Sequence, residues 1–332
     1  MRFAVVGAGA IGTFVGASLA DAGFDVTLVG RGDHVAAMLA NGVEVRGARR
    51  TFRVRVRATT AVAEVGSVDC VLLTVKAHDV PAVAGALEPL LRADTTIVAM
   101  QNGVPWWYFG AGGGPLAGTR LESVDPGGAV AGAIDPRRIV GSAVYSGARL
   151  LGSGVVRQSG DLDYVFGEPA GGTSERVGRI VDAFVQAGID ATEDPSIRHT
   201  IWVKLLGNTT FNPISALTRA TAAQMVDDVA VRAVVREAME EQVALGRRLG
   251  LDVNVALDER IARTRLLGDQ RTSMLQDVEA GRRLEIEPIL GAVVEIADRL
   301  GEPLPATRRL YALATLLDRA LADARSRRLV EA

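Results

Sequence analysis

Three glycines close to the amino terminus have the spacing that nucleotide chemistry requires. The run Gly7-Ala8-Gly9-Ala10-Ile11-Gly12 follows a short apolar stretch and precedes a segment rich in small residues. In such a run the first glycine permits a tight turn, the second lets backbone approach a pyrophosphate, and the third lets a helix pack closely on the sheet. The helix then directs free N–H groups at the phosphates. Because both flanks fit, we interpret the run as a dinucleotide-binding turn rather than an ordinary glycine-rich loop.

A lysine in the second half of the chain could supply a proton. Lys204, Asn208 and Asn212 follow one another at intervals of four in an apolar stretch, so they share one face if a helix continues past Pro213. Burying such a face is costly unless a ligand supplies polar partners, and a solvent-exposed polar face is the alternative. A desolvated lysine has a lowered pKa, and it can protonate a carbonyl oxygen and stabilise a developing alkoxide. These residues therefore favour the reduction of a ketone.

A third polar cluster lies between residues 272 and 287. Ser273 can offer a hydroxyl to a carboxylate, and Glu285 can accept a hydrogen bond from a substrate hydroxyl or orient a lysine. Acidic residues on helices are mostly solvated, so a surface helix explains this run equally well.

Apolar periodicity predicts the elements that position these residues. Strands and helices alternate in the first half, which indicates an α/β fold with a Rossmann-type, doubly wound, mostly parallel sheet. After the helix start at 194–196 the apolar spacing is helical throughout. We therefore expect a nucleotide-binding domain over 1–193 and an all-α substrate and catalytic domain over 194–332. The predicted elements are strands at 2–6, 25–29, 70–75, 95–100, 139–144, 154–157, 164–167 and 189–192, a half-exposed ribbon at 43–58, and helices at 10–22, 80–91, 174–187, 230–249, 284–300 and 306–324.

The carboxyl ends of these parallel strands should form the cofactor edge of the sheet. Arg31 follows the second strand at the position where NAD enzymes usually carry an acidic residue, and a guanidinium suits a 2′-phosphate. We therefore predict NADP(H) as the cofactor, with a solvated surface arginine as the alternative. Lys76 ends the strand at 70–75. Asn102 follows the strand at 95–100, where Asn102-Gly103 contacts the nicotinamide or substrate, or forms only a turn.

Composition excludes several other classes of function. The chain has 332 residues and a formal net charge of −2, which gives no electrostatic basis for binding nucleic acid. Three separated histidines and one cysteine form no recognisable metal motif. The sequence has no apolar run long enough to cross a membrane, and its first strand begins at residue 2, so we expect a cytoplasmic protein without a signal peptide.

The stretch 105–132 does not fit the alternating pattern. It is rich in glycine and carries Trp106-Trp107-Tyr108-Phe109. We interpret it as a long loop or small excursion packed by these aromatic side chains, with substrate contact as the less favoured alternative.

Taken together, these blocks resemble the ketopantoate reductase (2-dehydropantoate 2-reductase) family over nearly the whole chain. The resemblance rests on the glycine run, Val75-Lys76, Gln101-Asn102-Gly103, Lys204-Leu205 to Asn208, Asn212-Pro213-Ile214-Ser215-Ala216-Leu217-Thr218, and the run from Thr272 to Glu285. It implies a Rossmann domain and a helical domain with the active site in the cleft, and NADPH-dependent reduction of 2-dehydropantoate to (R)-pantoate. The segment 105–132 departs from the family pattern by its length.

The resemblance also implies roles for individual residues. Lys204 would be the general acid, and Glu285 would bind the substrate hydroxyl and support catalysis. Arg31 and Lys76 would contact the adenosine phosphate end of NADP(H) or help to bind ligands at the cleft. The remaining positions would hold substrate or cofactor, namely Asn102, Asn208, Asn212 and Ser273.

Two alternative functions stay open on the sequence alone. One is an NADP-dependent reductase of another 2-oxo acid on the same scaffold. The other is a non-catalytic NADPH-sensing protein, against which the residues Lys204, Asn208, Ser273 and Glu285 argue because a sensor needs none of them. The expected partner is a small-molecule 2-oxo acid, and a homodimer is left open as the assembly state.

Overall fold

A computed structural model of the chain describes residues 1–47, 49–160 and 163–331. Contacts between Cα atoms divide it into two compact units. The first contains residues 1–101, 105–112 and 127–200, and the second contains residues 102–104, 113–126 and 201–332. The last crossing between the units is at 200/201, whereas the boundary predicted from the sequence is 193/194, and two further segments of the first half belong to the second unit.

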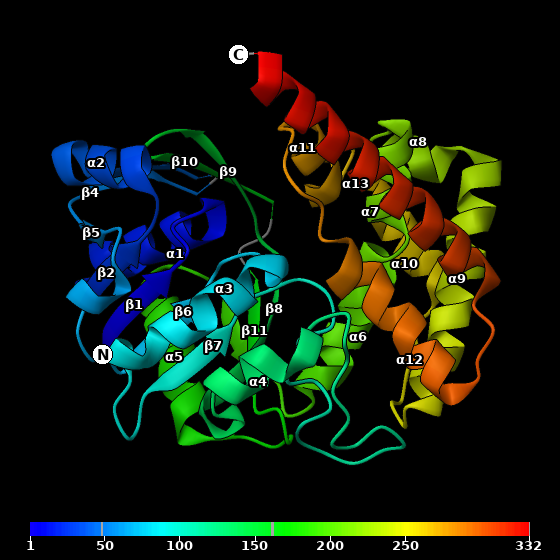
Figure 1. The fold of residues 1–332 in the computed structure, drawn as a ribbon, viewed down its shortest axis with the longest axis horizontal. Coiled ribbons are helices and arrows are strands. Elements are labelled where there is room, and N and C mark those ends of the chain that lie inside the picture. Colours follow the sequence, from blue (N-terminus) through cyan, green and yellow to red (C-terminus); the bar gives the residue numbers. More distant parts are fainter. Residues whose placement is uncertain (48, 161–162, 332) are drawn as a thin grey trace. The chain divides into compact units, whose positions relative to one another are not determined.

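The first unit is built on a large sheet with the strand order β12-β11-β8-β7-β6-β1-β2-β5, which is the Rossmann-type arrangement expected (Figure 1). All neighbouring strands are parallel except β8 and β11, which pair antiparallel. A second sheet has the order β4-β3-β10-β9. The strands are β1 (Arg2–Val6), β2 (Asp25–Val29), β3 (Val43–Arg46), β4 (Thr51–Val54), β5 (Arg57–Thr59), β6 (Cys70–Leu73), β7 (Thr96–Ala99), β8 (Ile139–Val144), β9 (Gly147–Gly152), β10 (Val155–Ser159), β11 (Tyr164–Gly167) and β12 (Ala191–Glu193).

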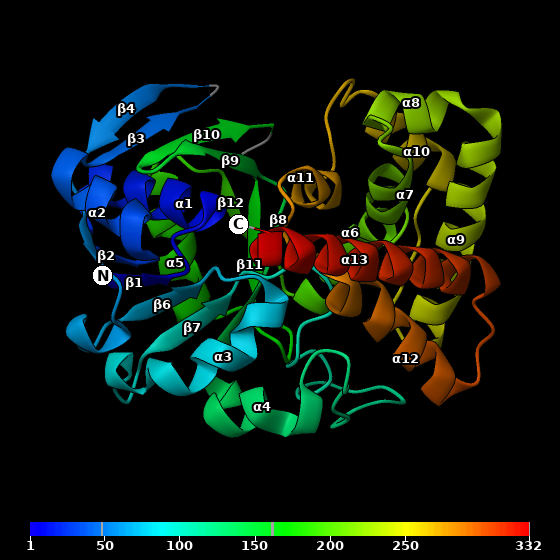
Figure 2. The same ribbon diagram turned by 45° about the horizontal axis from the view of Figure 1, so that its top comes forward.

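Helices cover both faces of the large sheet. Helix α1 packs against α5 on one face, and α3 contacts α4 on the other (Figure 2). This alternation follows from right-handed crossovers, because the connection from β1 to β2 runs in one direction along the sheet and that from β6 to β7 in the other. The helices of this unit are α1 (Ala10–Asp21), α2 (Gly32–Asn41), α3 (Val80–Ala84), α4 (Ala129–Ala133) and α5 (Glu175–Gln186).

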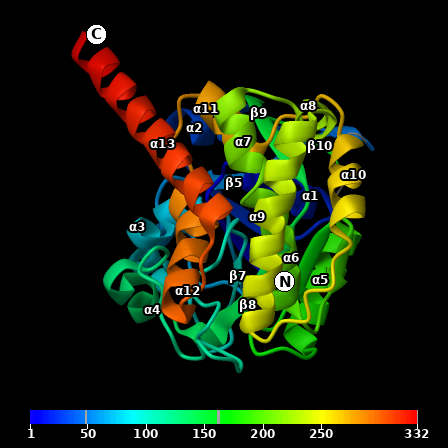
Figure 3. The same ribbon diagram turned by 90° about the vertical axis from the view of Figure 1, so that its right-hand side faces the viewer.

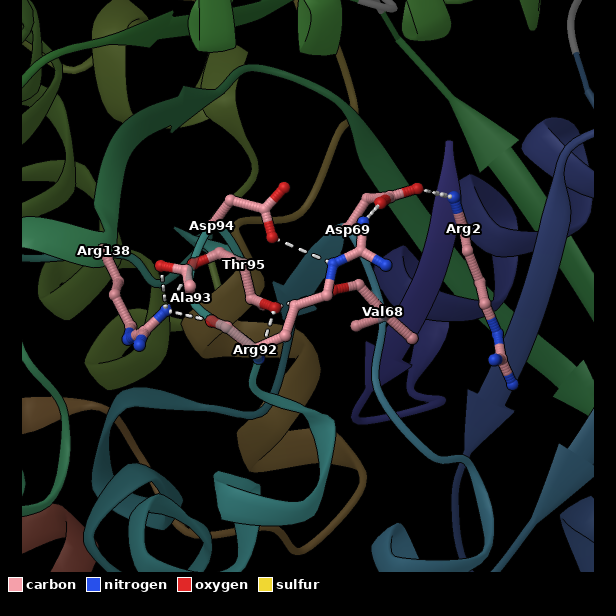
Figure 4. A network of polar contacts seen from close by, with 8 residues as sticks. All are labelled: Arg2, Val68, Asp69, Arg92, Ala93, Asp94, Thr95 and Arg138. Carbon is pink, nitrogen blue, oxygen red and sulfur yellow. Dashed lines mark hydrogen bonds and ion pairs between the residues drawn. The ribbon is translucent and has the colours of Figure 1, made fainter.

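Polar side chains close the amino-terminal edge of the large sheet (Figure 4). The carboxylate of Asp69 accepts the backbone N–H of Arg2 at 2.6 Å and pairs with the guanidinium of Arg92. The Thr95 hydroxyl donates to the carbonyl of Val68 at 2.6 Å, and Arg138 donates to the carbonyl of Arg92 at 2.7 Å. These bonds give hydrogen-bond partners to backbone groups at the strand ends that would otherwise be unpaired within the protein. The opposite, carboxyl edge is the one that carries the glycine turn.

The second unit is helical over its long carboxyl-terminal segment (Figure 3). Helix α13 packs along α7 and α9. Trp202 is buried, and its indole N–H donates to the carbonyl of Gln242 at 3.1 Å. A Cβ on Gly246 would lie 2.4 Å from that indole nitrogen, so a glycine is needed for α9 to approach α6 this closely. The helices are α6 (Ile197–Asn208), which the boundary between the units crosses, and α7 (Phe211–Thr218), α8 (Ala222–Asp227), α9 (Val229–Arg248), α10 (Leu257–Arg265), α11 (Ser273–Glu279), α12 (Ala292–Leu300) and α13 (Pro305–Glu331).

The structure differs from the sequence expectations at several elements. The helix expected over 80–91 is α-helical only in α3 and continues as a 3₁₀ helix at Gly85–Leu90, which contains Pro89. The helix expected over 284–300 begins with a π-helical turn at Glu287–Gly291 before α12. Strand β9 was not expected, because none of its residues is buried and they show no clear alternation. The half-exposed ribbon predicted over 43–58 is present as β3, β4 and part of β5.

The aromatic run after β7 is a packing feature. Trp106, Trp107, Tyr108 and Phe109 are all buried, and the Tyr108 hydroxyl donates to the carbonyl of Arg198 at 2.7 Å. A Cβ on Gly141 would lie 2.5 Å from the Trp107 ring, so the indole packs directly against β8. Packing, the favoured interpretation of this run, therefore accounts for these four side chains.

Candidate active site

The glycine turn has the backbone geometry that phosphate binding requires. Gly7 has a φ of +111°, and a Cβ there would lie 2.5 Å from the backbone nitrogen of Val75. A Cβ on Gly12 would lie 2.3 Å from the Gly7 carbonyl oxygen, whereas one on Gly9 would meet only that oxygen, at 3.9 Å. The turn is therefore closed on its sheet side and open at Gly9. Helix α1 begins directly after Gly9, and its first-turn N–H groups have no partners within the helix.

A threonine and a histidine, neither of which stands out in the sequence, support this turn. The Thr74 hydroxyl donates to the Gly7 carbonyl at 2.8 Å. The Gly154 N–H donates to Nδ1 of His34 at 3.1 Å, so the hydrogen on Nε2 faces the Thr13 hydroxyl at 3.0 Å. Neither residue type is distinctive at its sequence position, and only tertiary structure brings them to the turn.

Arg31 and Lys76 follow neighbouring strands of the sheet. Val6 of β1 pairs with Val29 of β2 and with Leu73 of β6, so the chain leaves these three strands at the same edge. The Arg31 side chain is 95% exposed, and its nearest ion-pair contact is Asp79, at 3.8 Å. Lys76 is half-buried and precedes the short helix Ala77–Asp79. One exposed and one half-buried cation at this edge suit an anionic nucleotide.

Gln101 and Asn102 end the β7 segment and divide between the two units. The side-chain N–H₂ of Gln101 donates to the carbonyls of Leu73, at 2.6 Å, and Val75, at 3.2 Å. The Asn102 side-chain oxygen accepts a hydrogen bond from Nζ of Lys204 at 2.7 Å. Gln101 is therefore hydrogen-bonded to the end of β6, and the next residue, Asn102, accepts a hydrogen bond from the amine of Lys204.

The amine of Lys204 lies in a desolvated position close to a carboxylate. Burial lowers the pKa of Lys204 to about 8, and the negative charge of Glu285 opposes this shift. Glu285 is itself buried, with 7% of its surface exposed. An amine with a pKa close to neutrality can exchange a proton with a substrate at physiological pH. The structure thus brings together Lys204, Asn102 and Glu285 from three distant parts of the sequence.

The other expected substrate residues lie on neighbouring helices of the same unit. Asn208 lies one turn after Lys204 on α6 and is half-buried. Asn212 is buried on α7, which is a separate helix because the chain turns at 209–210. The continuous helical face expected for all three residues therefore ends at Asn208. Ser273 is the first residue of α11, which packs on α7, and its side chain is exposed.

The break between α6 and α7 has a local cause. The hydroxyls of Thr209 and Thr210 donate back to the carbonyls of Leu205, at 2.9 Å, and Leu206, at 2.7 Å. Such back-bonding competes with the helical ladder and bends helices. Pro213 lies in the first turn of α7, where it lacks only an N–H that a helix start leaves unused.

The described residues contain neither a metal-binding cluster nor a membrane-spanning helix. Among them, no group of three or more histidine, cysteine, aspartate or glutamate side chains is arranged to hold a metal ion. Within the same part of the chain, no helix has both the length and the apolar character needed to cross a bilayer.

Comparison with known proteins identifies the family. The model of the ketopantoate reductase PanE/ApbA family matches residues 3–107, and that of its carboxyl-terminal region matches residues 196–318. A 2-dehydropantoate 2-reductase of Mesorhizobium japonicum is 43% identical over 94% of this chain and 96% of its own. The chain belongs to the ketopantoate reductase family. The family uses NADPH, and its members are oxidoreductases that act on a 2-oxo acid.

Solved structures agree with this assignment. A crystal structure described as a putative ketopantoate reductase from Ralstonia solanacearum superposes with a TM-score of 0.91 at 38% identity, covering 96% of this chain and 98% of its own. A ketopantoate reductase from Staphylococcus aureus, described as dimeric, has a TM-score of 0.73 at 21% identity and covers 97% of this chain and 100% of its own. The second likeness shows the fold alone.

Proposed function

We propose that the protein reduces 2-dehydropantoate to (R)-pantoate with NADPH, and that Lys204 is the general acid. The observation that carries the proposal is the amine of Lys204, which is desolvated, bonded to Asn102 and close to the charge of Glu285. Membership of the family supports the choice of substrate. A non-catalytic NADPH-binding protein would have no use for a lysine held in this way.

The residues at the carboxyl edge of the sheet fit NADPH. The open side of the turn at Gly9 leaves room for the pyrophosphate, and the first turn of α1 offers it N–H groups. We assign the 2′-phosphate to the exposed guanidinium of Arg31, and the adenosine phosphate end also to Lys76. When bound, NADPH supplies the hydride that adds to the C2 carbonyl carbon of the substrate.

Lys204 supplies the proton that balances this addition. Its ammonium donates to the C2 oxygen as the carbonyl becomes an alcohol, and its charge stabilises the oxygen while negative charge develops there. Asn102 accepts one ammonium hydrogen at 2.7 Å and so orients the amine. The negative charge of Glu285 favours the protonated form of the amine, so the acid is charged near neutral pH.

The remaining polar residues are proposed to recognise the substrate. Glu285, which is buried, would accept a hydrogen bond from the substrate hydroxyl. Asn208, Asn212 and Ser273 would donate to its carboxylate or hold the cofactor. These assignments follow the family motifs residue by residue.

A substrate panel tests the proposed reaction. Purified protein is assayed with NADPH and 2-dehydropantoate, and with 2-oxo acids that differ in the branching at C3 or lack the C4 hydroxyl. We expect kcat/KM for 2-dehydropantoate to exceed that of every other compound by at least about tenfold, because a site built to bond a hydroxyl rejects analogues without one. Equal or faster turnover of another 2-oxo acid would assign the same scaffold to that substrate. An absence of turnover with the whole panel, together with tight NADPH binding, would favour the sensing alternative.

The assembly state and location are secondary proposals. We infer a homodimer, supported by the description of the Staphylococcus aureus relative as dimeric. Sedimentation velocity at micromolar concentration tests it, and a monomer throughout the range would contradict it. The expected cytoplasmic location stays a prediction.

A further inference from the structure

Helix α13 holds the short segment Leu284–Pro288 on both sides of Glu285. The carboxylate of Asp318 accepts the backbone N–H of Leu284 at 3.0 Å. The Tyr311 hydroxyl lies 3.0 and 3.1 Å from the two carboxylate oxygens of Glu287. Tyr311 and Asp318 are seven residues apart, which is two helical turns, so they share one face of α13. A single helix therefore anchors the residues that flank Glu285.

The same segment also holds the chain that carries Asn102. The carbonyl of Pro288 lies in the π-helical turn Glu287–Gly291 and accepts the N–H of Val104 at 2.7 Å. Gly103 has a φ of +87°, and a Cβ there would lie 2.2 Å from the Pro288 oxygen. Only glycine both adopts this conformation readily and permits this approach. The bond to Val104 thus fixes the backbone two residues after Asn102.

The turn that contains Pro288 is π-helical rather than α-helical. An inserted residue in a helix interrupts the regular ladder, and such insertions are frequent at functional sites. The Glu287 carboxylate lies close against Gly291, since a Cβ there would be 2.1 Å from it. A side chain at residue 291 would therefore displace the group that Tyr311 binds.

We propose that the segment Leu284–Pro288 is the positioning element of the active site. Tyr311 and Asp318 of α13 fix the position of this segment. The segment in turn positions Glu285, which it contains, and Asn102, through its contact with Gly103. Tyr311, Asp318 and Gly103 are positioning residues that touch neither substrate nor cofactor. The inference rests on the proposed function, because it assigns these residues the task of orienting the acid of that reaction.

Small displacements should matter at this site. The bond between Asn102 and Lys204 is 2.7 Å long, and a shift of about 1 Å would take it outside hydrogen-bond range. Misplacement of a reacting group by such a distance can lower the rate about 100-fold. A positioning defect should therefore lower kcat much more than it raises KM.

The scarcity of lysine makes a direct test practical. The sequence contains only Lys76 and Lys204, so protein labelled with ¹³C at the lysine side chains gives two Cε signals in an NMR titration. The substitution Lys76→Arg assigns them. The pH at which the Lys204 signal shifts then reports the surroundings of the amine without requiring any turnover.

Two variants perturb the positioning element from opposite sides. Tyr311→Phe removes the hydroxyl that holds Glu287, and Gly103→Ala forces the chain away from Pro288. We expect both to move the Lys204 midpoint to lower pH by about half a unit or more, because the amine loses an acceptor or the nearby carboxylate. We also expect kcat to fall at least about tenfold, with KM for 2-dehydropantoate within about threefold of wild type. Asp318→Ala should act in the same direction, and Asp318→Asn should restore the wild-type values because its side-chain oxygen still accepts from Leu284.

Matched controls separate positioning from general destabilisation. Gly301→Ala introduces a side chain at a φ of +69°, where a Cβ has no atom within 4 Å, so it adds backbone strain without a clash. Tyr108→Phe removes a buried tyrosine hydrogen bond in the first unit. Both controls should lower the Tm and leave the Lys204 midpoint and kcat unchanged.

The results distinguish this inference from the proposed function. Variants of Tyr311 and Asp318 that fold, but titrate and turn over like the two controls, overturn the inference even if wild type is an efficient reductase. A wild-type protein that does not reduce 2-dehydropantoate contradicts the proposed function, while the titration still tests the positioning of Lys204. If Gly103→Ala does not fold, the variants of Tyr311 and Asp318 decide.

Discussion

The side-chain oxygen of Asn102 lies 2.7 Å from the amine of Lys204, although 102 positions separate the two residues in the sequence. Asn102 is joined by one peptide bond to Gln101, whose side chain is bonded to the carbonyls at the end of β6. The acceptor for the acid therefore directly follows, in the chain, a residue whose side chain is hydrogen-bonded at the end of β6. Under the proposed function, activity depends on whether the amine of Lys204 is protonated.

The pH dependence of the reaction should follow the ionisation of Lys204. The reduction needs the ammonium form, and its pKa is lowered to about 8 by burial. The protonated fraction is full below this pH and decreases as the pH rises through it, so kcat/KM for reduction should fall about tenfold per pH unit above pH 8. The reverse oxidation of pantoate needs the free amine and should rise over the same range. Initial rates between pH 6 and pH 10 in both directions measure this.

Substitution of Glu285 should shift this profile. Its negative charge raises the pKa of Lys204 against the effect of burial, so Glu285→Gln should move the midpoint to lower pH. Glu279→Gln is the matched control, because Glu279 is an exposed residue of α11 that pairs with Arg271. An unchanged midpoint in Glu285→Gln would contradict the electrostatic coupling between the two residues.

Removal of the amine should nearly abolish turnover. We expect Lys204→Ala to lower kcat by about 10² to 10⁴, since a positioned general acid contributes on this scale. NADPH binding, measured by fluorescence titration, should stay close to wild type and serves as the control for folding. Wild-type turnover in this variant would remove Lys204 from the mechanism.

Two glycines of the phosphate turn should respond differently to the same substitution. Gly12→Ala places a Cβ 2.3 Å from the Gly7 carbonyl oxygen and should destabilise the protein by about 1–3 kcal/mol. Gly9→Ala meets no atom closer than 3.9 Å, so its Tm without cofactor should equal that of wild type. Its added methyl group occupies the space proposed for the pyrophosphate, and its Kd for NADPH should therefore rise at least about tenfold. Thermal unfolding with and without NADPH measures both effects, and unchanged affinity in Gly9→Ala would place the phosphates elsewhere.

The choice between NADPH and NADH should depend on Arg31. A guanidinium bonded to a 2′-phosphate contributes about 1.5–3 kcal/mol, so Arg31→Ala should lower kcat/KM for NADPH by about 10- to 150-fold and leave that for NADH almost unchanged. Arg137→Ala is the control, because Arg137 is similarly exposed, at 89%, and pairs with a nearby aspartate. A wild-type enzyme that prefers NADH would contradict the assignment from the outset.

Local sequence patterns predicted the nucleotide-binding half well. Strands β1 and β2 have the expected bounds, because strands covered on both faces are continuous apolar runs that the sequence shows directly. The turn at Gly7–Gly12 was likewise predicted directly from the sequence, through the spacing of its glycines. Strand β9 was missed because none of its residues is buried, so burial imposes no pattern on them.

The arrangement around Lys204 could be predicted only in part. The lysine stood out because a charged residue lies within an apolar helical stretch, but its partner Asn102 comes from a distant loop that no local pattern connects to it. The π-helical turn at Glu287–Gly291 was read as ordinary helix, since its apolar spacing is the same. Its hydrogen-bond partners Val104 and Tyr311 are tertiary contacts that no local pattern indicates.

The alternating assignment of chain segments to the two units has a consequence for protein engineering. Residues 102–104 and 113–126 group with the helices, while the stretches around them group with the sheet. A chimera that exchanges the halves at 193/194 would combine a foreign lysine with a native Asn102, and a foreign Pro288 with a native Gly103. Functional grafts between relatives should therefore transplant these two short insertions along with the carboxyl-terminal half, and a single crossover point should yield proteins that bind the nucleotide without turning over.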